Sequence, residues 1–171
     1  HKEDLLAPAG EGFSAALSTI NEARTYVASM CCSMIEASLR LSVDYATERE
    51  SFGKPIIEHQ GLSWQLARVA NQVEAARALT DKAIAAIEHG DSESAILPAA
   101  HAKKFATEVV ESALSACAQA MGANGLREEH LIGHRLTAGR VANYVDGSTE
   151  IMTDRIAKSL PTTYRTVKFD Q

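Results

Sequence analysis

Apolar residues recur every three or four positions along most of this chain, which is the spacing of one face of an α-helix. The pattern predicts a first helix over about residues 14–49 and a second over about residues 58–89. The apolar faces carry Leu17, Ile20, Val27, Cys31, Met34, Leu41 and Tyr45 in the first, and Leu62, Leu66, Val69, Val73, Ala76, Ala83 and Ile87 in the second. Between them, Gly53 and Pro55 predict a break, because glycine can cap a helix end and proline cannot continue one.

Three further helical segments follow. The third runs from about Glu93 or Pro98 to Met121, and the small residues on its face allow close approach to a neighbouring helix. Shorter segments cover about residues 129–142 and 151–160.

These long amphipathic segments and short links predict an all-α fold, an up-down antiparallel four-helix bundle over residues 14–160 with a short extra C-terminal helix. Residues 1–13 are expected to be the end of a preceding β-domain or an extended lead-in, and residues 161–171 a tail without periodicity. The composition agrees, because 46% of residues are hydrophobic and only 5% aromatic, with few prolines and glycines to interrupt helices.

Charged side chains qualify this picture at two places. Arg24 lies in register with the apolar face of the first helix, and a buried charge needs a partner or a water-filled pocket. The alternative is that its long side chain reaches the rim of the bundle, where the guanidinium meets water. The adjacent Lys103 and Lys104 are predicted to form a solvated helix face, with only their stems covering apolar surface.

Charge and cysteine content narrow the function classes. With 17 basic and 22 acidic residues the net charge is −5, which argues against a general nucleic-acid binder. Cys31, Cys32 and Cys117 follow no disulfide framework and predict buried free thiols in a reducing compartment, the cytoplasm or the mitochondrial matrix. No C-x-x-C or H-E-x-x-H pattern occurs, so the sequence does not support a metal site.

The apolar runs and the first residues of the sequence give expectations about membrane spans, a signal peptide and whether the chain is part of a longer protein. No run of 18 apolar residues occurs, so we expect no membrane span. No signal peptide is visible, and the first residue is His rather than Met. We therefore expect the chain to begin inside a longer protein.

The segment Tyr144-Val145-Asp146-Gly147-Ser148-Thr149-Glu150-Ile151 concentrates candidate chemistry just before the last predicted helix. Asp146 is expected on a loop at a helix N-terminus, beside backbone N–H groups that lack partners. Gly147 allows a positive φ or a close approach of a ligand to the backbone. A carboxylate in this position could cap the helix or abstract a proton, and the segment alone leaves both open.

Two other interruptions of the helices carry unusual patterns. One is Glu48-Arg49-Glu50-Ser51-Phe52-Gly53-Lys54-Pro55-Ile56 with Gln60 after it, and the other is Gln119-Ala120-Met121-Gly122-Ala123-Asn124-Gly125. Together with residues 146–151, these patterns follow the order and approximate spacing of the acyl-CoA dehydrogenase family. Over about residues 5–160 the sequence resembles the C-terminal helical domain of that family.

The resemblance implies a flavoprotein that removes two hydrogens from the Cα–Cβ bond of an acyl-CoA thioester, with FAD as hydride acceptor. Asp146 matches the catalytic base and Arg24 its partner. Asn21, Arg24 and Gly147 fall on the substrate side. The positions that match FAD contacts are Arg49, Phe52, Gln60, Gln119, Gly122, Ser148 and Glu150. The family also implies a homodimer or homotetramer, or a heteromer with a related subunit, and electron-transfer flavoprotein as acceptor.

Several departures from the family pattern keep other functions open. The base is usually Glu, so Asp146 is one methylene shorter; Val145 stands where Tyr is often found, and Asn21 where Asp is often found. The alternative base position of one family branch is Ala23 here. A non-catalytic subunit or paralogue that keeps the bundle for assembly is therefore the alternative hypothesis, and a purely structural oligomerisation module is the third.

Overall fold

The computed structural model describes residues 4–8, 10–89 and 92–165. Residues 1–3 and 9 of the predicted lead-in and residues 166–171 of the predicted tail lie outside this description, as does the side chain of Leu17.

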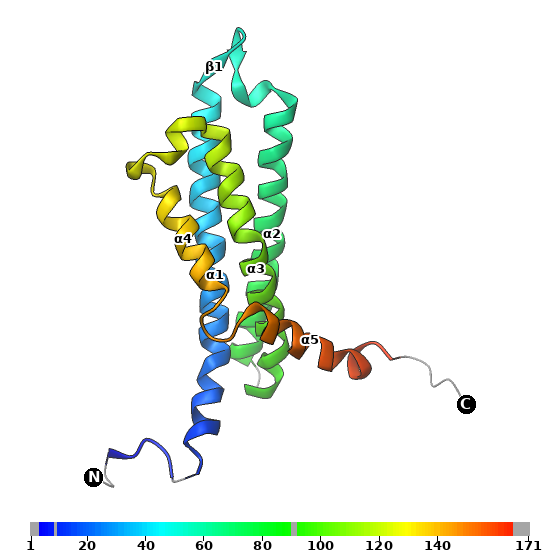
Figure 1. Cartoon of the computed structure of the whole chain (residues 1–171). Coiled ribbons are helices and arrows are strands. Elements are labelled where there is room, and N and C mark those ends of the chain that lie inside the picture. Colours follow the sequence, from blue (N-terminus) through cyan, green and yellow to red (C-terminus); the bar gives the residue numbers. More distant parts are fainter. Residues whose placement is uncertain (1–3, 9, 90–91, 166–171) are drawn as a thin grey trace.

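Over the described residues the fold consists of five α-helices. The first four run alternately up and down (Figure 1). Their bounds are Gly12–Glu48 for α1, Gln60–His89 for α2, Ser92–Met121 for α3, Ile132–Ala142 for α4 and Thr149–Thr163 for α5. The all-α antiparallel bundle predicted from periodicity is thereby confirmed. The fifth helix crosses the lower part of the bundle and projects away from it (Figure 1).

Helix α3 is the centre of the packing, because it contacts α1, α2, α4 and α5. Its face toward the neighbours is built from alanines and other small residues that are fully buried, so several helix backbones can approach it closely. Ala102, Ala106 and Ala113 lie in the same cluster as Val27 and Ile35 of α1. The three cysteines are buried and free, as predicted. Burial raises the pKa of Cys31 to about 12, and a nearby Cys32 adds to the effect.

A short hairpin joins α1 to α2 where the sequence predicted a break. Strands β1 (Glu50–Ser51) and β2 (Lys54–Pro55) pair antiparallel, with Ser51 opposite Lys54. The two loop residues are Phe52 with φ 52° and Gly53 with φ 80°. Two consecutive positive φ angles are those of the hairpin turn whose twist matches the flanking strands. Glycine adopts this conformation freely, whereas Phe52 does so at a steric cost.

The connection from α3 to α4 differs from the prediction. Two 3₁₀ helices, η3 (Gly122–Leu126) and η4 (Glu128–His130), precede α4, so the predicted helix over residues 129–142 begins three residues late. The cause is Leu131, which has φ 57° and ends the preceding turn before α4 starts.

The last helix is longer than predicted, since α5 continues through Pro161 to Thr163. Its final turn closes with a hydrogen bond from the backbone N–H of Tyr164 to the carbonyl of Leu160. In the described part of the chain, none of the helices is both long and apolar enough to traverse a bilayer.

Candidate functional site

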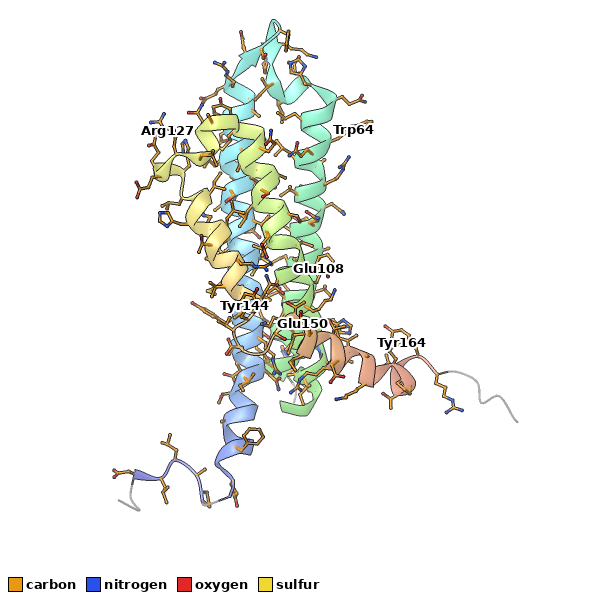
Figure 2. All side chains as sticks on the ribbon, viewed as in Figure 1. Trp64, Glu108, Arg127, Tyr144, Glu150 and Tyr164 are labelled. Atoms are coloured by element: carbon orange, nitrogen blue, oxygen red, sulfur yellow. The ribbon has the colours of Figure 1, made fainter. Side chains whose placement is uncertain are left out.

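The loop between α4 and α5, which carries Asp146 in its sequence, lies at the lower part of the bundle (Figure 1). Figure 2 labels Tyr144 in this loop and Glu150 in the first turn of α5. Asp146 and Gly147 have φ angles of 52° and 97°, so the chain makes two consecutive left-handed steps. The loop is closed by Thr149, whose backbone N–H and hydroxyl donate to Asn143 over 3.2 and 2.9 Å.

Ser148 is the residue that caps α5. Its hydroxyl oxygen accepts from the backbone N–H of Ile151 over 3.4 Å. The sequence left two roles open for Asp146, capping the helix or abstracting a proton. The residue that caps the helix is Ser148, not Asp146. The carboxylate of Asp146 stands two residues before the cap, half-buried beside the positive end of the helix.

Arg24 reaches this loop from α1. Its side chain is only 4% exposed, so it does not extend to the rim of the bundle. The guanidinium donates through Nε to the backbone carbonyl of Asp146 over 3.0 Å and through Nη1 to Oδ1 of Asn21 over 2.9 Å. Arg24 therefore bonds to the peptide oxygen of Asp146, whereas the pairing expected from the sequence was with its carboxylate.

Burial is the main cause that lowers the pKa of Arg24 below its ordinary value. The positive charge of Arg155 lowers it further, and the negative charge of Asp146 opposes both effects. The carboxylate therefore lies close enough to act on Arg24 through its charge. A methyl group added at Gly147 would come within 3.5 Å of Nη2 of Arg24 and 3.2 Å of Cε of Met152.

Lys103 is a site residue that the sequence reasoning missed. It was predicted to lie on a solvated helix face, and that prediction is wrong: the residue is 0% exposed. Its ammonium donates to the backbone carbonyl of Gly147 over 2.5 Å. The signal was present in the spacing, because Lys103 follows Ala99 by four positions and precedes Ala106 by three, on the buried face of α3.

The charged groups around the loop shift one another's pKa values. Burial lowers the pKa of Lys103; the charge of Asp146 opposes this and that of Arg24 adds to it. Glu150, in the first turn of α5, has a lowered pKa because the Ser148 hydroxyl and its own backbone N–H bond to its carboxylate. Two buried cations thus bond to the backbone of the Asp146–Gly147 turn, near the carboxylates of Asp146 and exposed Glu150.

The remaining predicted site residues lie at the opposite end of the bundle (Figure 1). Arg49, Phe52 and Gln60 belong to the hairpin and the start of α2, and Gln119 and Gly122 to the end of α3. All five are exposed, and the ring of Phe52 is 97% exposed. The chain therefore does not bring these residues to Asp146 within one protomer.

The glycines near the end of α3 have different physical roles. Gly122 has φ 58° and nothing within 4 Å of where a Cβ would be. Gly125 is buried, and a Cβ there would overlap the carbonyl oxygen of Ala118 and lie 2.8 Å from its Cα. Gly125 is thus required for packing of η3 on α3, whereas Gly122 leaves open space at the surface.

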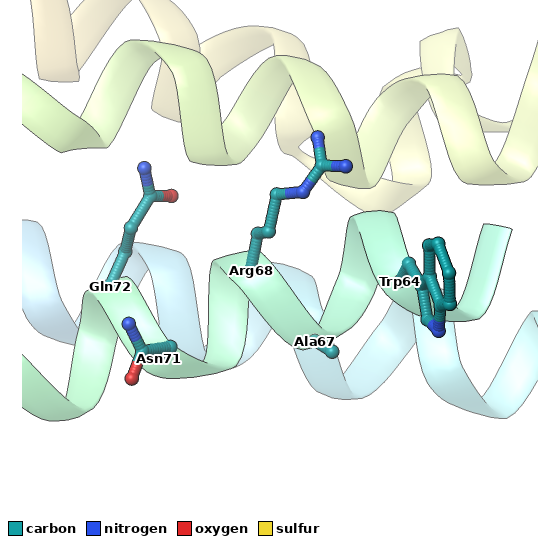
Figure 3. A pocket seen from close by; sticks show the side chains of 5 residues that line it. All are labelled: Trp64, Ala67, Arg68, Asn71 and Gln72. Atoms are coloured by element: carbon teal, nitrogen blue, oxygen red, sulfur yellow. The ribbon is translucent and has the colours of Figure 1, made fainter. Parts of the chain in front are cut away.

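The described surface has several hollows, and two of them bear on the site or its controls. One of about 370 Å³ adjoins the Asp146 loop and is lined by polar residues of α3, α4 and α5, including Glu111, Asn143 and Glu150. The other, of about 490 Å³, is formed along α2 alone by Trp64, Ala67, Arg68, Asn71 and Gln72 (Figure 3). Among the described residues, no group of three or more His, Cys, Asp or Glu side chains could hold a metal ion.

Comparison with known proteins gives a consistent result. Residues 10–160 match the family model described as the C-terminal domain of acyl-CoA dehydrogenase. The chain is 31% identical over 160 residues to the short/branched chain specific acyl-CoA dehydrogenase of Rattus norvegicus, covering 94% of this chain and 37% of that protein. It is 33% identical to an acyl-CoA dehydrogenase of Bacillus subtilis, covering 92% of this chain and 41% of that protein.

The fold agrees with the sequence match. Butyryl-CoA dehydrogenase from Megasphaera elsdenii superimposes with a TM-score of 0.87 at 29% identity, over 94% of this chain and 41% of that one. The chain spans about two fifths of the length of these relatives. It belongs to the acyl-CoA dehydrogenase family and corresponds to the family's C-terminal helical domain.

Proposed function

We propose that the protein carrying this chain is an FAD-dependent acyl-CoA dehydrogenase in which Asp146 is the catalytic base. The observation that carries the proposal is the Asp146–Gly147 turn. The carboxylate of Asp146 does not cap α5, because Ser148 does so. The backbone carbonyls of the turn accept hydrogen bonds from Arg24 and Lys103. A base must be both positioned and unoccupied to take a proton from carbon, and the fixed backbone of this turn supports that role.

In the proposed reaction, the carboxylate of Asp146 takes the α-proton of an acyl-CoA thioester. The electron pair of that C–H bond becomes part of the new double bond, and Asp146 becomes the neutral acid. FAD, when bound, accepts the hydrogen of the β-carbon as hydride. Arg24 and Asn21 are buried and bond to each other, so we assign them to holding the turn on the substrate side together with Gly147.

The groups proposed to hold FAD fit its chemistry. The guanidinium fork of exposed Arg49 suits a pyrophosphate, and the exposed ring of Phe52 offers a flat apolar surface. Phe52 keeps this exposure in a left-handed conformation that is costly for a non-glycine residue, and such strain is typical of functional sites. Gln60, Gln119 and Gly122 lie at the same end of the bundle.

Ser148 and Glu150 are the proposed contacts at the other end, beside the base. Because the two groups lie at opposite ends of one chain, we propose that each cofactor is held between two subunits of a homodimer or homotetramer, or of a heteromer with a related subunit. Electron-transfer flavoprotein is the proposed electron acceptor, and the free buried thiols support a reducing compartment.

The test is purification of the whole protein and assay against a panel of acyl-CoA thioesters with an artificial electron acceptor. We expect a yellow protein whose flavin is bleached by its substrate. A colourless protein that takes up no FAD would contradict the proposal. The same panel identifies the acyl group.

A non-catalytic paralogue is the second candidate. It is favoured by one observation, the shorter acid at position 146, since proton transfer requires heavy atoms about 2.6–3.2 Å apart. This function predicts FAD uptake without turnover of any thioester in the panel.

A further inference from the structure

The two backbone carbonyls of the Asp146–Gly147 turn are each held by a different buried cation. Arg24 of α1 donates to the carbonyl of Asp146, and Lys103 of α3 donates to the carbonyl of Gly147. The loop's own bonds at the end of α4 run through Asn143, Tyr144 and Thr149. The direction in which the turn faces is therefore fixed by two helices that precede it in sequence.

Burying an ammonium is unfavourable unless a partner compensates for its lost water. Lys103 has such a partner at Gly147, and a hydrogen bond from a charged donor is stronger than one between neutral groups. An apolar side chain of the same length would satisfy the packing of α3 without this cost. The presence of a lysine at a fully buried position thus requires a reason beyond packing.

We propose that Lys103 is a positioning residue for the base: it fixes the Asp146–Gly147 turn through the Gly147 carbonyl and supplies a buried positive charge beside the Asp146 carboxylate. The inference rests on the proposed function of Asp146. It concerns this chain's own residues and can be measured without turnover.

The charged and titratable groups that act on Lys103 come from α1, α5 and the loop that carries Asp146. They are Asp146 on the loop, Glu150 on α5, and Arg24 and the Cys31 thiol on α1, with Arg155 acting on Arg24. Asp146 is the largest of the favourable charges, since its negative charge raises the pKa of Lys103.

The experiment compares the whole protein with its Lys103→Met and Lys104→Met variants. Methionine is an unbranched apolar side chain one atom shorter than lysine and suits the buried position, but it leaves the Gly147 carbonyl without its donor. Lys104 is the matched control, because it is the next residue of α3, is partly exposed and pairs with Glu108. Lys103→Gln, a neutral donor one bond shorter, is the second variant if Lys103→Met does not yield folded protein.

Hydrogen–deuterium exchange of residues 143–152 is the readout that needs no activity. The amides of Thr149, Ile151 and Met152 are bonded within this loop and the first turn of α5. We expect them to exchange at least about 10-fold faster in Lys103→Met and unchanged in Lys104→Met. Equal exchange in the wild type and Lys103→Met would overturn the inference, whatever the activity.

Kinetics separate positioning from a merely structural role. We expect kcat to fall about 10- to 100-fold with KM changed less, because the misplaced base affects the chemical step. A kcat equal to that of the wild type would reduce Lys103 to a structural residue and refute its effect on the base. A wild-type protein without turnover would refute the proposed function. The exchange data would still show whether Lys103 holds the Asp146–Gly147 turn in place.

Discussion

Arg24 donates to the backbone carbonyl of Asp146 over 3.0 Å, a contact between residues 122 positions apart in sequence. The same guanidinium holds Asn21, so its fork spans one turn of α1 and the loop that carries the acid. Lysine at this position would keep the charge but has no planar fork that could make both bonds.

We therefore expect Arg24→Lys to lower the free energy of unfolding by about 1.5–3 kcal/mol, the range for a lost hydrogen bond to a charged group. Turnover should fall by at least about tenfold, because the carbonyl of Asp146 is no longer fixed. Urea unfolding and kcat measure the two effects. Arg40→Lys is the control, since Arg40 is exposed on the same helix and should change stability by less than about 0.5 kcal/mol.

Asp146 itself is tested with two substitutions of similar size. Asp146→Asn keeps the shape of the side chain but cannot accept the proton, so we expect kcat to fall about 10²- to 10⁴-fold with FAD still bound. Asp146→Glu restores the longer acid and should retain activity. Unchanged turnover in Asp146→Asn would show that another group is the base and would favour the paralogue hypothesis for this residue.

Arg49 distinguishes a cofactor site from an oligomerisation module. Its side chain is exposed at the start of the hairpin, so Arg49→Ala should leave the melting temperature of the apo-protein unchanged while FAD is lost on gel filtration. Arg68→Ala is the control, because Arg68 lines the separate hollow on α2 (Figure 3). Equal FAD retention in both variants would support the structural module.

The glycines of η3 give a prediction about stability alone. Gly125→Ala should destabilise the protein by about 1–3 kcal/mol, because its methyl group meets the backbone of Ala118, which cannot move without disturbing α3. Gly122→Ala meets no atom and incurs only the cost of its left-handed backbone, about 1–2 kcal/mol. Thermal unfolding of the two variants compares them, and a lower cost for Gly125→Ala would contradict the packing assignment.

The helices were predictable from sequence because their information is local. Apolar spacing over residues 12–48 and 60–89 places one face of each helix in the core, whatever lies opposite. The break at Gly53 and Pro55 followed from the backbone requirements of these two residues. The left-handed Leu131 was missed, since nothing in a leucine side chain favours that conformation and tertiary packing imposes it.

The site was predictable only in part, for a related reason. The segment around Asp146 could be located from its motif, but the partner of Gly147 lies 44 positions earlier, on a helix whose lysine pair looks like an ordinary solvated surface. Arg24 attracted notice because it interrupts a stripe of larger apolar residues. Lys103 interrupts alanines, where a charged residue stands out less, and its burial depends on the loop that covers it.

The division of the candidate residues between the two ends of the bundle has a genetic consequence for an assembled protein. If each catalytic centre takes its acid from one subunit and its arginine from the next, a chain defective at Asp146 and a chain defective at Arg49 can compensate for each other. In a mixed dimer, one centre inherits both defects and the other inherits neither. Two inactive alleles, expressed together, would then restore half of the centres in each mixed dimer.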